Sequence, residues 1–427
     1  MTLDAAPSPA AAPDPNAVDP AVPLARPWWS RPGLDAVAGR LTIAGRDAET
    51  LAREHGTPLF VYDRTRFADN AERVIAALDR SGLRHRVRFA LKANPDPEAL
   101  AVLRPLVGVD ACSPGEVLRA LDCGWPATDI SVTATNLSDR DLDVILVHPV
   151  HLNLDAVSQI ERLGRRLAAR GLPPRSIGLR INPGAGVGYN EKLAYSGERP
   201  TKFGIYADRV GDAVAAARRH GLAIDTIHVH AGSGWLADGL PSFEAALERI
   251  VGVTRALVAD GHRIVELNVG GGLGVPARAD EQAIDLDAYA ATIARQVGGL
   301  DVAIGCEPGD YLAKDTAILL AEVVTVEERA GTRFVGLDVG WNVNCSFFIY
   351  GYAQELVVCR AADAPRTEAV TIAGHINEAG DLFAEDYPFP PVVEGDIVAL
   401  LNAGGYHQAM SSTHCLRPHA EALFLDR

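Results

Sequence analysis

Lysine is scarce in this chain of 427 residues. Only four of its 40 basic residues are lysines, at positions 92, 192, 202 and 314. Where arginine supplies the surface charge, a lysine at a strand end is a candidate for chemistry, because its amine can lose a proton and attack a carbonyl. Lys92 stands at such a place, in VRFALKANPDP (87–97), where an alternating apolar run ends before a proline. The alternative is an ordinary surface lysine.

Several other features are absent. The six cysteines (112, 123, 306, 345, 359 and 415) form no CxxC pair. This pattern disfavours a disulfide framework or a metal site and predicts reduced thiols in the cytoplasm. No apolar run approaches the roughly 18 residues of a membrane span. The net charge of −15 disfavours nucleic acid and anionic membranes as partners.

The length predicts more than one domain, because single hydrophobic cores stop growing below this size. The start of the chain is rich in Ala, Pro and Asp and lacks the basic and apolar segments of a secretion signal, so we expect a disordered tail. The expected boundaries are the tail at 1–30, a strand and helix joining the β domain at 31–62, a barrel at 63–308 and the β domain at 309–427.

In the middle of the chain, short apolar runs alternate with longer segments of helical spacing. Strands that alternate with helices predict parallel βα units. Eight units in about 220 residues favour a closed (β/α)8 barrel over an open doubly wound sheet. The expected strands are 87–92, 108–113, 129–134, 151–155, 176–182, 226–232, 266–271 and 301–308.

Polar or special residues fall at the C-terminal ends of all eight expected strands. Barrels of this kind carry their active sites at that end. The residues are Lys92, Asp110, Asn136, Asp155, Arg180, His230, Gly270 to Gly272 and Glu307.

After about residue 310, strands joined by short turns replace the helical segments, which predicts an antiparallel β domain. The expected strands are 317–329, 333–340, 354–360, 368–374, 395–402 and 421–427, with the early stretch 41–63 joining them.

The segment NVGGGLGVP (268–276) places three glycines directly after a strand. Backbone N–H groups there can close on a phosphate, although a tight turn without a ligand fits the segment as well. It does not stand at the start of a βαβ domain, as a dinucleotide-binding motif requires.

The segment HVHAGSGW (228–235) alternates two histidines with a valine, so His228 and His230 point to the same side, toward the barrel interior or its mouth. A zinc pair needs a third ligand, and none with suitable spacing is evident. The pattern favours a stacking or hydrogen-bonding histidine, with a satisfied core histidine as the alternative.

The segment CEPGD (306–310) places Glu307 at the end of the last barrel strand. A buried carboxylate needs a positive partner, and a protonated cofactor ring supplies one. A lysine for a Schiff base, a glycine pocket for a phosphate, a histidine face and this carboxylate together predict a pyridoxal phosphate site. By keeping the ring nitrogen protonated, Glu307 favours decarboxylation over racemisation.

The ordered motifs resemble the fold-type III pyridoxal phosphate-dependent decarboxylases, the group of diaminopimelate and ornithine decarboxylases. The resemblance runs from about residue 40 to the C-terminus. It rests on FALKANPDP, VDACSPGE, LNLD, LRINPG, TKFGI, HVHAGSG, NVGGGLG, CEPG, GHINEAGD, EGDIVALLNAGGY and MSSTHCLRP.

This resemblance implies an amino-acid substrate and a homodimer in which the partner's GHINEAGD segment completes each active site. It also implies the role of each site residue. Lys92 forms the Schiff base, His230 stacks on the ring, Glu307 pairs with the ring nitrogen, and Asp110 and Arg180 lie near the ring. The phosphate is held by Ser233, Gly271, Gly272 and Tyr406, and Gly309 also contacts the cofactor.

The chain departs from this family in GHINEAGD (374–381). The family has a cysteine that returns a proton to Cα, and here that position is Asn377, flanked by Glu378 and Asp381. An amide has no acidic proton to give. Either protonation differs in face or rate, or another group is the acid, with Cys345, His375, His414, Tyr352 and water as candidates.

A second departure is Asp310, where the family has an arginine. WNVNCSFFIYG (341–351) also lacks the arginine that binds the distal carboxylate of diaminopimelate. We therefore expect a substrate whose distal end is cationic or neutral. The alternative is that these acids only hold local backbone or the dimer interface. The residues expected near the substrate are Asp310, Cys345, Glu378 and Asp381.

The sequence thus predicts a pyridoxal phosphate-dependent carboxy-lyase for an amino acid or an amino-acid-derived intermediate. One alternative is a racemase or epimerase on the same barrel, which Glu307 disfavours. Another is a non-catalytic binding or regulatory relative, which would be expected to lose Lys92 or the phosphate pocket, and both persist.

Overall fold

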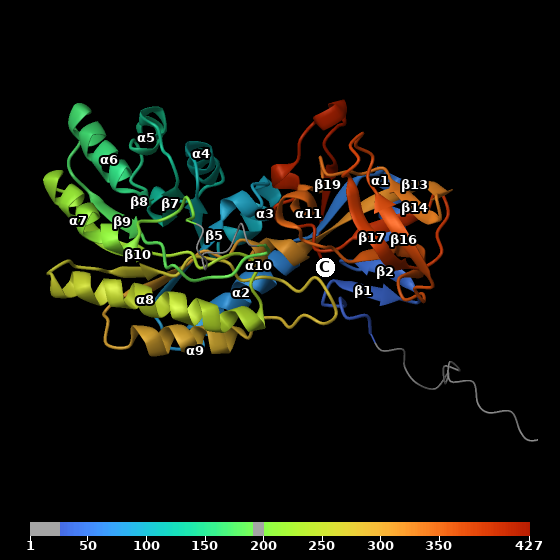
Figure 1. The fold of residues 1–427 in the computed structure, drawn as a ribbon, viewed down its shortest axis with the longest axis horizontal. Helices are drawn as coiled ribbons and strands as arrows, with labels where there is room; N and C mark the ends of the chain where they lie inside the picture. Colours follow the sequence, from blue (N-terminus) through green and yellow to red (C-terminus); the bar gives the residue numbers. More distant parts are fainter. Residues whose placement is uncertain (1–25, 191–199) are drawn as a thin grey trace, which may run out of the picture.

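A computed structural model describes residues 26–190 and 200–427. Most of the tail expected at 1–30, and Lys192, fall outside these ranges. The described chain forms a barrel of strands and helices with a β domain beside it, as Figure 1 shows. No helix within the two described ranges is long and apolar enough to cross a membrane.

Eight parallel strands close the barrel, and each expected barrel strand overlaps one of them. The predicted (β/α)8 barrel is therefore confirmed. Around the barrel the strand order is β10-β11-β12-β5-β6-β7-β8-β9. Their bounds are β5 (His85–Ala90), β6 (Gly108–Ala111), β7 (Ile130–Ala134), β8 (His151–Leu154), β9 (Ser176–Arg180), β10 (Ala223–His228), β11 (Glu266–Asn268) and β12 (Ala303–Cys306).

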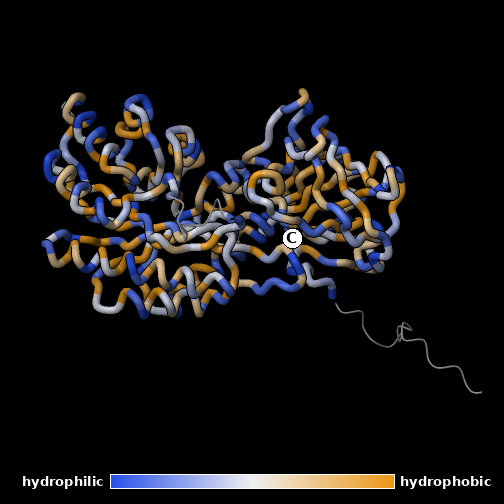
Figure 2. Tube along the Cα trace, viewed as in Figure 1, coloured by the Kyte–Doolittle hydropathy of each residue, from blue (hydrophilic) through white to orange (hydrophobic). Residues whose placement is uncertain are grey.

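Helices cover the outside of the barrel. The helix before the first strand, α2 (Arg64–Arg80), packs against both α3 and α9 and so closes the ring. The others, each following its strand, are α3 (Pro97–Leu103), α4 (Pro114–Asp122), α5 (Asp139–Ile145), α6 (Val157–Ala169), α7 (Val210–Arg219), α8 (Leu240–Ala259) and α9 (Leu286–Val297). Figure 2 shows apolar and polar segments alternating along α8 and α9, as expected of helices with one buried face.

The β domain holds the remaining strands, in the order β15-β18-β13-β14-β16-β17, with β4 beside β13 and β19 beside β4. Two pairings, β14–β16 and β4–β19, are parallel, so the expected antiparallel domain is a mixed one. β17 and a short helix, α11 (Cys345–Tyr350), were not expected. The strands are β4 (Leu59–Asp63), β13 (Ala317–Arg329), β14 (Thr332–Leu337), β15 (Leu356–Val358), β16 (Glu368–Ala373), β17 (Leu382–Phe389), β18 (Ile397–Leu400) and β19 (Glu421–Leu425).

A small sheet and a second core complete the β domain. One hydrophobic core runs through the barrel and the adjoining side of the β domain, and a second lies beneath the small sheet and the first helix. The elements around this second core are β1 (Leu34–Val37), β2 (Arg40–Ile43), β3 (Arg46–Asp47) and α1 (Ala48–His55).

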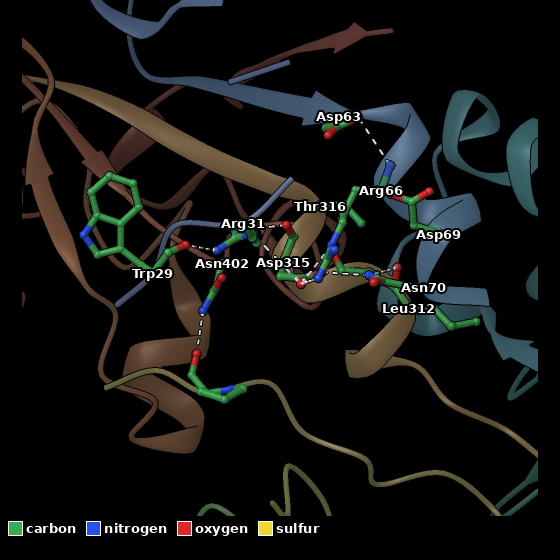
Figure 3. A network of polar contacts seen from close by, with 12 residues as sticks. Trp29, Arg31, Asp63, Arg66, Asp69, Asn70, Leu312, Asp315, Thr316 and Asn402 are labelled. Atoms are coloured by element: carbon green, nitrogen blue, oxygen red, sulfur yellow. Dashed lines mark hydrogen bonds and ion pairs between the residues drawn. The ribbon is translucent and has the colours of Figure 1, made fainter. Parts of the chain in front are cut away.

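A buried ionic network joins the two parts of the chain (Figure 3). Asp315 lies in a single turn, η6 (Lys314–Thr316), just before β13. Its carboxylate accepts hydrogen bonds from Arg66 at 2.5 Å and Asn70 at 2.7 Å, both on α2, and its carbonyl accepts one from Arg31 at 2.9 Å. The last barrel strand is linked to the β domain by α10 (Asp310–Ala313) and η6. Because buried charges need partners, the network holds this link against α2.

Candidate functional site

Lys92 lies in a single turn, η1 (Leu91–Ala93), directly after β5. Its neighbour Ala93 is buried, whereas Lys92 is exposed, so the turn directs the amine away from the core. The β domain holds this turn, because the backbone N–H of Tyr406 donates to the carbonyl of Ala93 at 2.8 Å. The scarce lysine therefore lies where the barrel meets the β domain.

Cys112, which follows β6, has its thiol 3.2 Å from the amine of Lys92. Burial raises the pKa of Cys112 to about 12, so the thiol keeps its proton at neutral pH. The pKa of Lys92 is raised above its ordinary value, first by Cys112 and then by Tyr406 and Asp110, and together these groups outweigh the desolvation of the amine by the surrounding chain. The contact of Cys112 with Lys92 was not predictable from sequence, because only the pairing of β5 with β6 brings the two residues together.

Glu307 follows β12 and is buried, with a partner on each carboxylate oxygen. His228 Nε2 lies 2.9 Å from Oε2, and the amide of Asn268 donates to Oε1 at 2.6 Å. Burial opposes ionisation, but the charge and hydrogen bond of His228, with Arg88 and Asn268, outweigh it and lower the pKa of Glu307 to about 2. The sequence placed His228 on the side of His230 but did not reveal this partner.

Asp110, in β6, is buried close to both Glu307 and Lys92. Burial first, and the charge of Glu307 second, raise the pKa of Asp110 well above its usual range. Its Oδ1 atom has no hydrogen-bond partner among the described residues. A buried polar atom without a partner calls for an explanation, and a bound ligand is one.

His230 follows β10, and its Nε2 atom lies 3.4 Å from the hydroxyl of Ser233. Burial, and after it the positive charges of Arg180 and Lys92, lower the pKa of His230 well below its usual range. The imidazole is therefore neutral and suited to stacking. Arg180, the last residue of β9, has its guanidinium 4.6 Å from the ring centre of Phe203.

The glycines after β11 pack closely against neighbouring backbone. A side chain at Gly271 would overlap the carbonyl of Glu307, and one at Gly272, where φ is +102°, would overlap the carbonyl of Gly232. In the described parts of the chain, the N–H groups of Gly271 and Gly272 have no acceptor. Free backbone N–H groups in a glycine turn are donors for an anion.

Tyr406 brings its hydroxyl to the same place from the β domain. A Cβ atom at Gly309 would lie 2.6 Å from that hydroxyl, and the N–H of Gly309 also lacks an acceptor among the described residues. Tyr406 has φ +61°, a left-handed conformation that costs energy for a residue other than glycine. Ser346 holds it there by donating to its carbonyl at 3.1 Å. Strain of this kind is typical of functional sites.

Asp310 is buried and already has partners. The hydroxyl of Tyr189 donates to its Oδ2 atom, and the ammonium of Lys314 lies 3.1 Å from its Oδ1 atom. Cys345 is buried beside Tyr406, with its thiol 3.9 Å from the Tyr406 carbonyl, and burial raises the pKa of Cys345 to about 11.

The segment 374–381 divides into two parts. Asp381 is buried, and its carboxylate accepts the backbone N–H groups of Trp341 at 2.8 Å and Ile376 at 2.7 Å. Asn377 and Glu378 are exposed. Within the described ranges, neither Asn377 nor Glu378 forms a hydrogen bond or ion pair with the groups around Lys92. The structure therefore brings together Lys92, the Glu307 group and the glycine turn, but not Asn377, Glu378 or Asp381.

Comparison with known proteins identifies the family. Residues 66–314, more than half of the chain, match the family described as pyridoxal-dependent decarboxylase, pyridoxal binding domain. The chain belongs to this family. A diaminopimelate decarboxylase from Methanothermobacter thermautotrophicus is 37% identical over 399 residues, covering 90% of each chain. One from Escherichia coli K12 is 32% identical, covering 89% of this chain and 92% of the relative.

Solved structures agree with the family assignment. The crystal structure of diaminopimelate decarboxylase from Helicobacter pylori complexed with L-lysine superposes with a TM-score of 0.80 at 26% identity, over 88% of this chain and 93% of that one. The chain is thus a pyridoxal phosphate-dependent decarboxylase, a carboxy-lyase acting on an amino acid. This confirms the predicted family, fold, cofactor and reaction class over the racemase and non-catalytic alternatives.

Proposed function

We propose that Lys92 carries the cofactor and that the groups around it hold each part of that molecule. The phosphate would accept hydrogen bonds from the backbone N–H groups of Gly271, Gly272 and Gly309. Their lack of acceptors within the described chain supports this assignment, as does the approach of the Tyr406 hydroxyl to Gly309. Ser233, beside His230, would donate its hydroxyl from the other side.

Glu307 would face the pyridine nitrogen, with His230 stacked on the ring and Asp110 and Arg180 beside it. When bound, the cofactor accepts the electron pair left at Cα as carbon dioxide departs. The role of Glu307 is to keep a proton on the ring nitrogen, and a carboxyl group with a pKa of about 2 is anionic at neutral pH. His228 and Asn268 orient it. The observation that carries the proposal is the buried Glu307 carboxylate, held at the end of the last barrel strand with His228 on one oxygen and Asn268 on the other.

The substrate we propose is an amino acid whose distal end is neutral or cationic, rather than meso-diaminopimelate. The support comes from Asp310, which stands where the family has an arginine. The cation next to it, Lys314, is paired with Asp310 and fully buried, so it does not offer a free charge to a distal carboxylate. An unpaired carboxylate is costly to bring into such a site.

Asn377 would change how the proton returns to Cα, because an amide has no acidic proton. Restoring the family residue with Asn377→Cys tests this directly. In deuterated water, we expect the variant to change either the rate of product formation or the configuration of the deuterium at Cα. An unaltered product and rate would show that residue 377 is not at the reacting carbon.

We also propose a homodimer in which the 374–381 segment completes the partner's site. Asn377 and Glu378 are exposed in the single chain, and large apolar side chains near them are exposed as well. Phe348 is 57% and Ile349 52% exposed on α11, and Leu416 is 94% exposed. Large apolar side chains exposed in one region of a surface are typical of protein interfaces. Sedimentation analysis should give twice the chain mass, and a monomer with full activity would contradict the proposal.

The attachment at Lys92 has its own test. Borohydride reduction of the yellow holoenzyme, followed by peptide mass spectrometry, should place the pyridoxyl group on Lys92. The Lys92→Ala variant should stay colourless, while Lys202→Ala, at a lysine outside the proposed pocket, should remain yellow. Label on another lysine would contradict the assignment.

A further inference from the structure

Lys314 is fully buried, which is uncommon for a lysine. It begins η6, four residues after Asp310, and its ammonium lies 3.1 Å from Asp310 Oδ1. The same ammonium donates to the hydroxyl of Tyr189 at 2.7 Å and lies 3.9 Å from the ring centre of Tyr352. An ion pair, a hydrogen bond and a cation–π contact thus replace the water that the charge has lost.

Tyr189 reaches this pair from the barrel, in the chain that follows β9. Its hydroxyl donates to Oδ2 of Asp310 and accepts from Lys314, so both hydrogen-bonding directions are used. Its ring packs on Gly234, where any side chain would overlap it, and lies 5.4 Å from the ring centre of Tyr352. The ring is therefore fixed both at its hydroxyl and along its face.

The tyrosines above the buried pair are partly exposed. Tyr189, Tyr350 and Tyr406 are each half-buried, whereas Asp310 and Lys314 are buried. The ring centres of Tyr189 and Tyr350 are 6.3 Å apart, and so are those of Tyr350 and Tyr406. The three neighbouring rings form an aromatic wall, and at its Tyr406 end the backbone binds the turn that carries Lys92.

We propose that Tyr189 is a specificity-determining residue and that Asp310 and Lys314 are a positioning pair that acts through it. The ring of Tyr189 forms the wall along the distal chain of the substrate. The inference rests on the proposed role of Lys92. Because Asp310 and Lys314 cancel each other's charge beneath the ring, the wall presents aromatic carbon without net charge. Such a wall fits amino acids whose distal part is apolar. It also fits a cationic distal group, which can make a cation–π contact with the face of the ring.

Three variants test this arrangement. Tyr189→Phe keeps the ring and removes its hydrogen bonds to the pair. Asp310→Asn combined with Lys314→Met removes both charges together and leaves no unpaired buried charge. Tyr311→Phe, on α10, is the matched control, because the buried hydroxyl of Tyr311 has no hydrogen-bond partner among the described residues.

The substrate is the amino acid turned over fastest in a panel containing L-lysine, L-ornithine, L-leucine and meso-diaminopimelate. KM and kcat of the holoenzyme are measured with it, and the Kd of its product amine is measured by calorimetry. We expect Tyr189→Phe and the Asp310/Lys314 double variant each to raise KM and Kd about fivefold to tenfold, with kcat nearly unchanged. The triple variant should add little, because residues that act as a unit are not additive. Tyr311→Phe should match the unmodified enzyme.

Unchanged KM and Kd, or fully additive effects, would overturn the inference. If the double variant does not fold, Tyr189→Phe alone decides. Failure of the proposed function has a different signature, namely loss of the borohydride label from Lys92 or preference for meso-diaminopimelate, and both are measured without these variants.

Discussion

His228 Nε2 lies 2.9 Å from Glu307 Oε2, and both side chains are buried in the barrel. The pair turns a carboxyl group that burial would keep neutral into an anion. The barrel thus carries a negative charge at the end of its last strand before any cofactor binds. In the function proposed for the site, this charge would hold a proton on the cofactor ring.

The stability of the fold should therefore decrease at acidic pH as Glu307 becomes protonated. Its pKa of about 2 lies below the ordinary value of 4.5, so the ionised carboxylate stabilises the fold above pH 4.5. This contribution, on the order of 3 kcal/mol, is lost as pH falls from 4.5 toward 2. Denaturant unfolding of the native protein and Glu307→Gln across this range should show their free energies of unfolding converging. A difference that does not change with pH would contradict the lowered pKa.

Gly309→Ala should weaken cofactor binding more than it weakens the fold. The new methyl group would lie 2.6 Å from the Tyr406 hydroxyl, which can shift because it is the end of a side chain. If Tyr406 binds the phosphate as proposed, its shift would remove one donor. A hydrogen bond to a charged group contributes about 1.5–3 kcal/mol, which corresponds to at least a tenfold loss in affinity. Absorbance titration of the apoprotein with pyridoxal phosphate measures this.

The control is Gly211→Ala on α7, where a methyl group meets nothing within 4 Å. It should leave cofactor affinity unchanged and stabilise the helix by roughly 0.5–1 kcal/mol. Equal cofactor affinities for the two variants would count against Gly309 as part of the phosphate pocket.

Glu378→Ala and Asp381→Ala should behave differently although they lie three residues apart. Asp381 accepts two backbone N–H groups from a buried position, so its loss should destabilise the fold by about 2–3 kcal/mol. Glu378 is exposed, so its loss should leave the melting temperature nearly unchanged. It should lower the activity of the dimer, in which this segment is proposed to complete the partner's site. Calorimetry with parallel activity assays separates them. A stability loss for Glu378→Ala would place it in the fold instead of the site.

Asp315→Ala should be strongly destabilising, because it leaves the buried guanidinium of Arg66 without its carboxylate partner (Figure 3). Breaking a buried ion pair in this way costs about 3–5 kcal/mol. Asp301→Ala is the matched control. Its ion pair with Arg84 lies at the surface, where the Asp301 side chain is 97% exposed, and surface pairs contribute only about 0–1 kcal/mol. Similar unfolding free energies for the two variants would contradict a stabilising role for the network.

The barrel was predictable from the sequence because its strands are short apolar runs at regular spacing, with a polar residue at each C-terminal end. Lys92 and Glu307 stood out for that reason. The β domain was harder, since β17 (Leu382–Phe389) is charged and partly exposed and has no clear alternation. One of its two parallel pairings, β4–β19, also depends on β4, which enters the domain before the barrel begins.

The partners of the site residues were harder to predict than the residues themselves. His228 was placed on the correct side of its strand, but its contact with Glu307 joins residues 79 positions apart. Lys314 was noted only as a scarce lysine, although its spacing of four from Asp310 on a helical turn was a usable signal. Asp381, which the motif predicts near the substrate, accepts two backbone N–H groups, and a role toward the substrate stays a prediction.

We propose a decarboxylase whose substrate does not end in a free carboxylate. The most direct test of this proposal is the release of carbon dioxide by the purified holoenzyme from a panel of amino acids that includes meso-diaminopimelate, L-lysine and L-ornithine. We predict that turnover of an amino acid with a neutral or cationic distal end exceeds that of meso-diaminopimelate. Turnover of meso-diaminopimelate well above every other member of the panel would contradict the account.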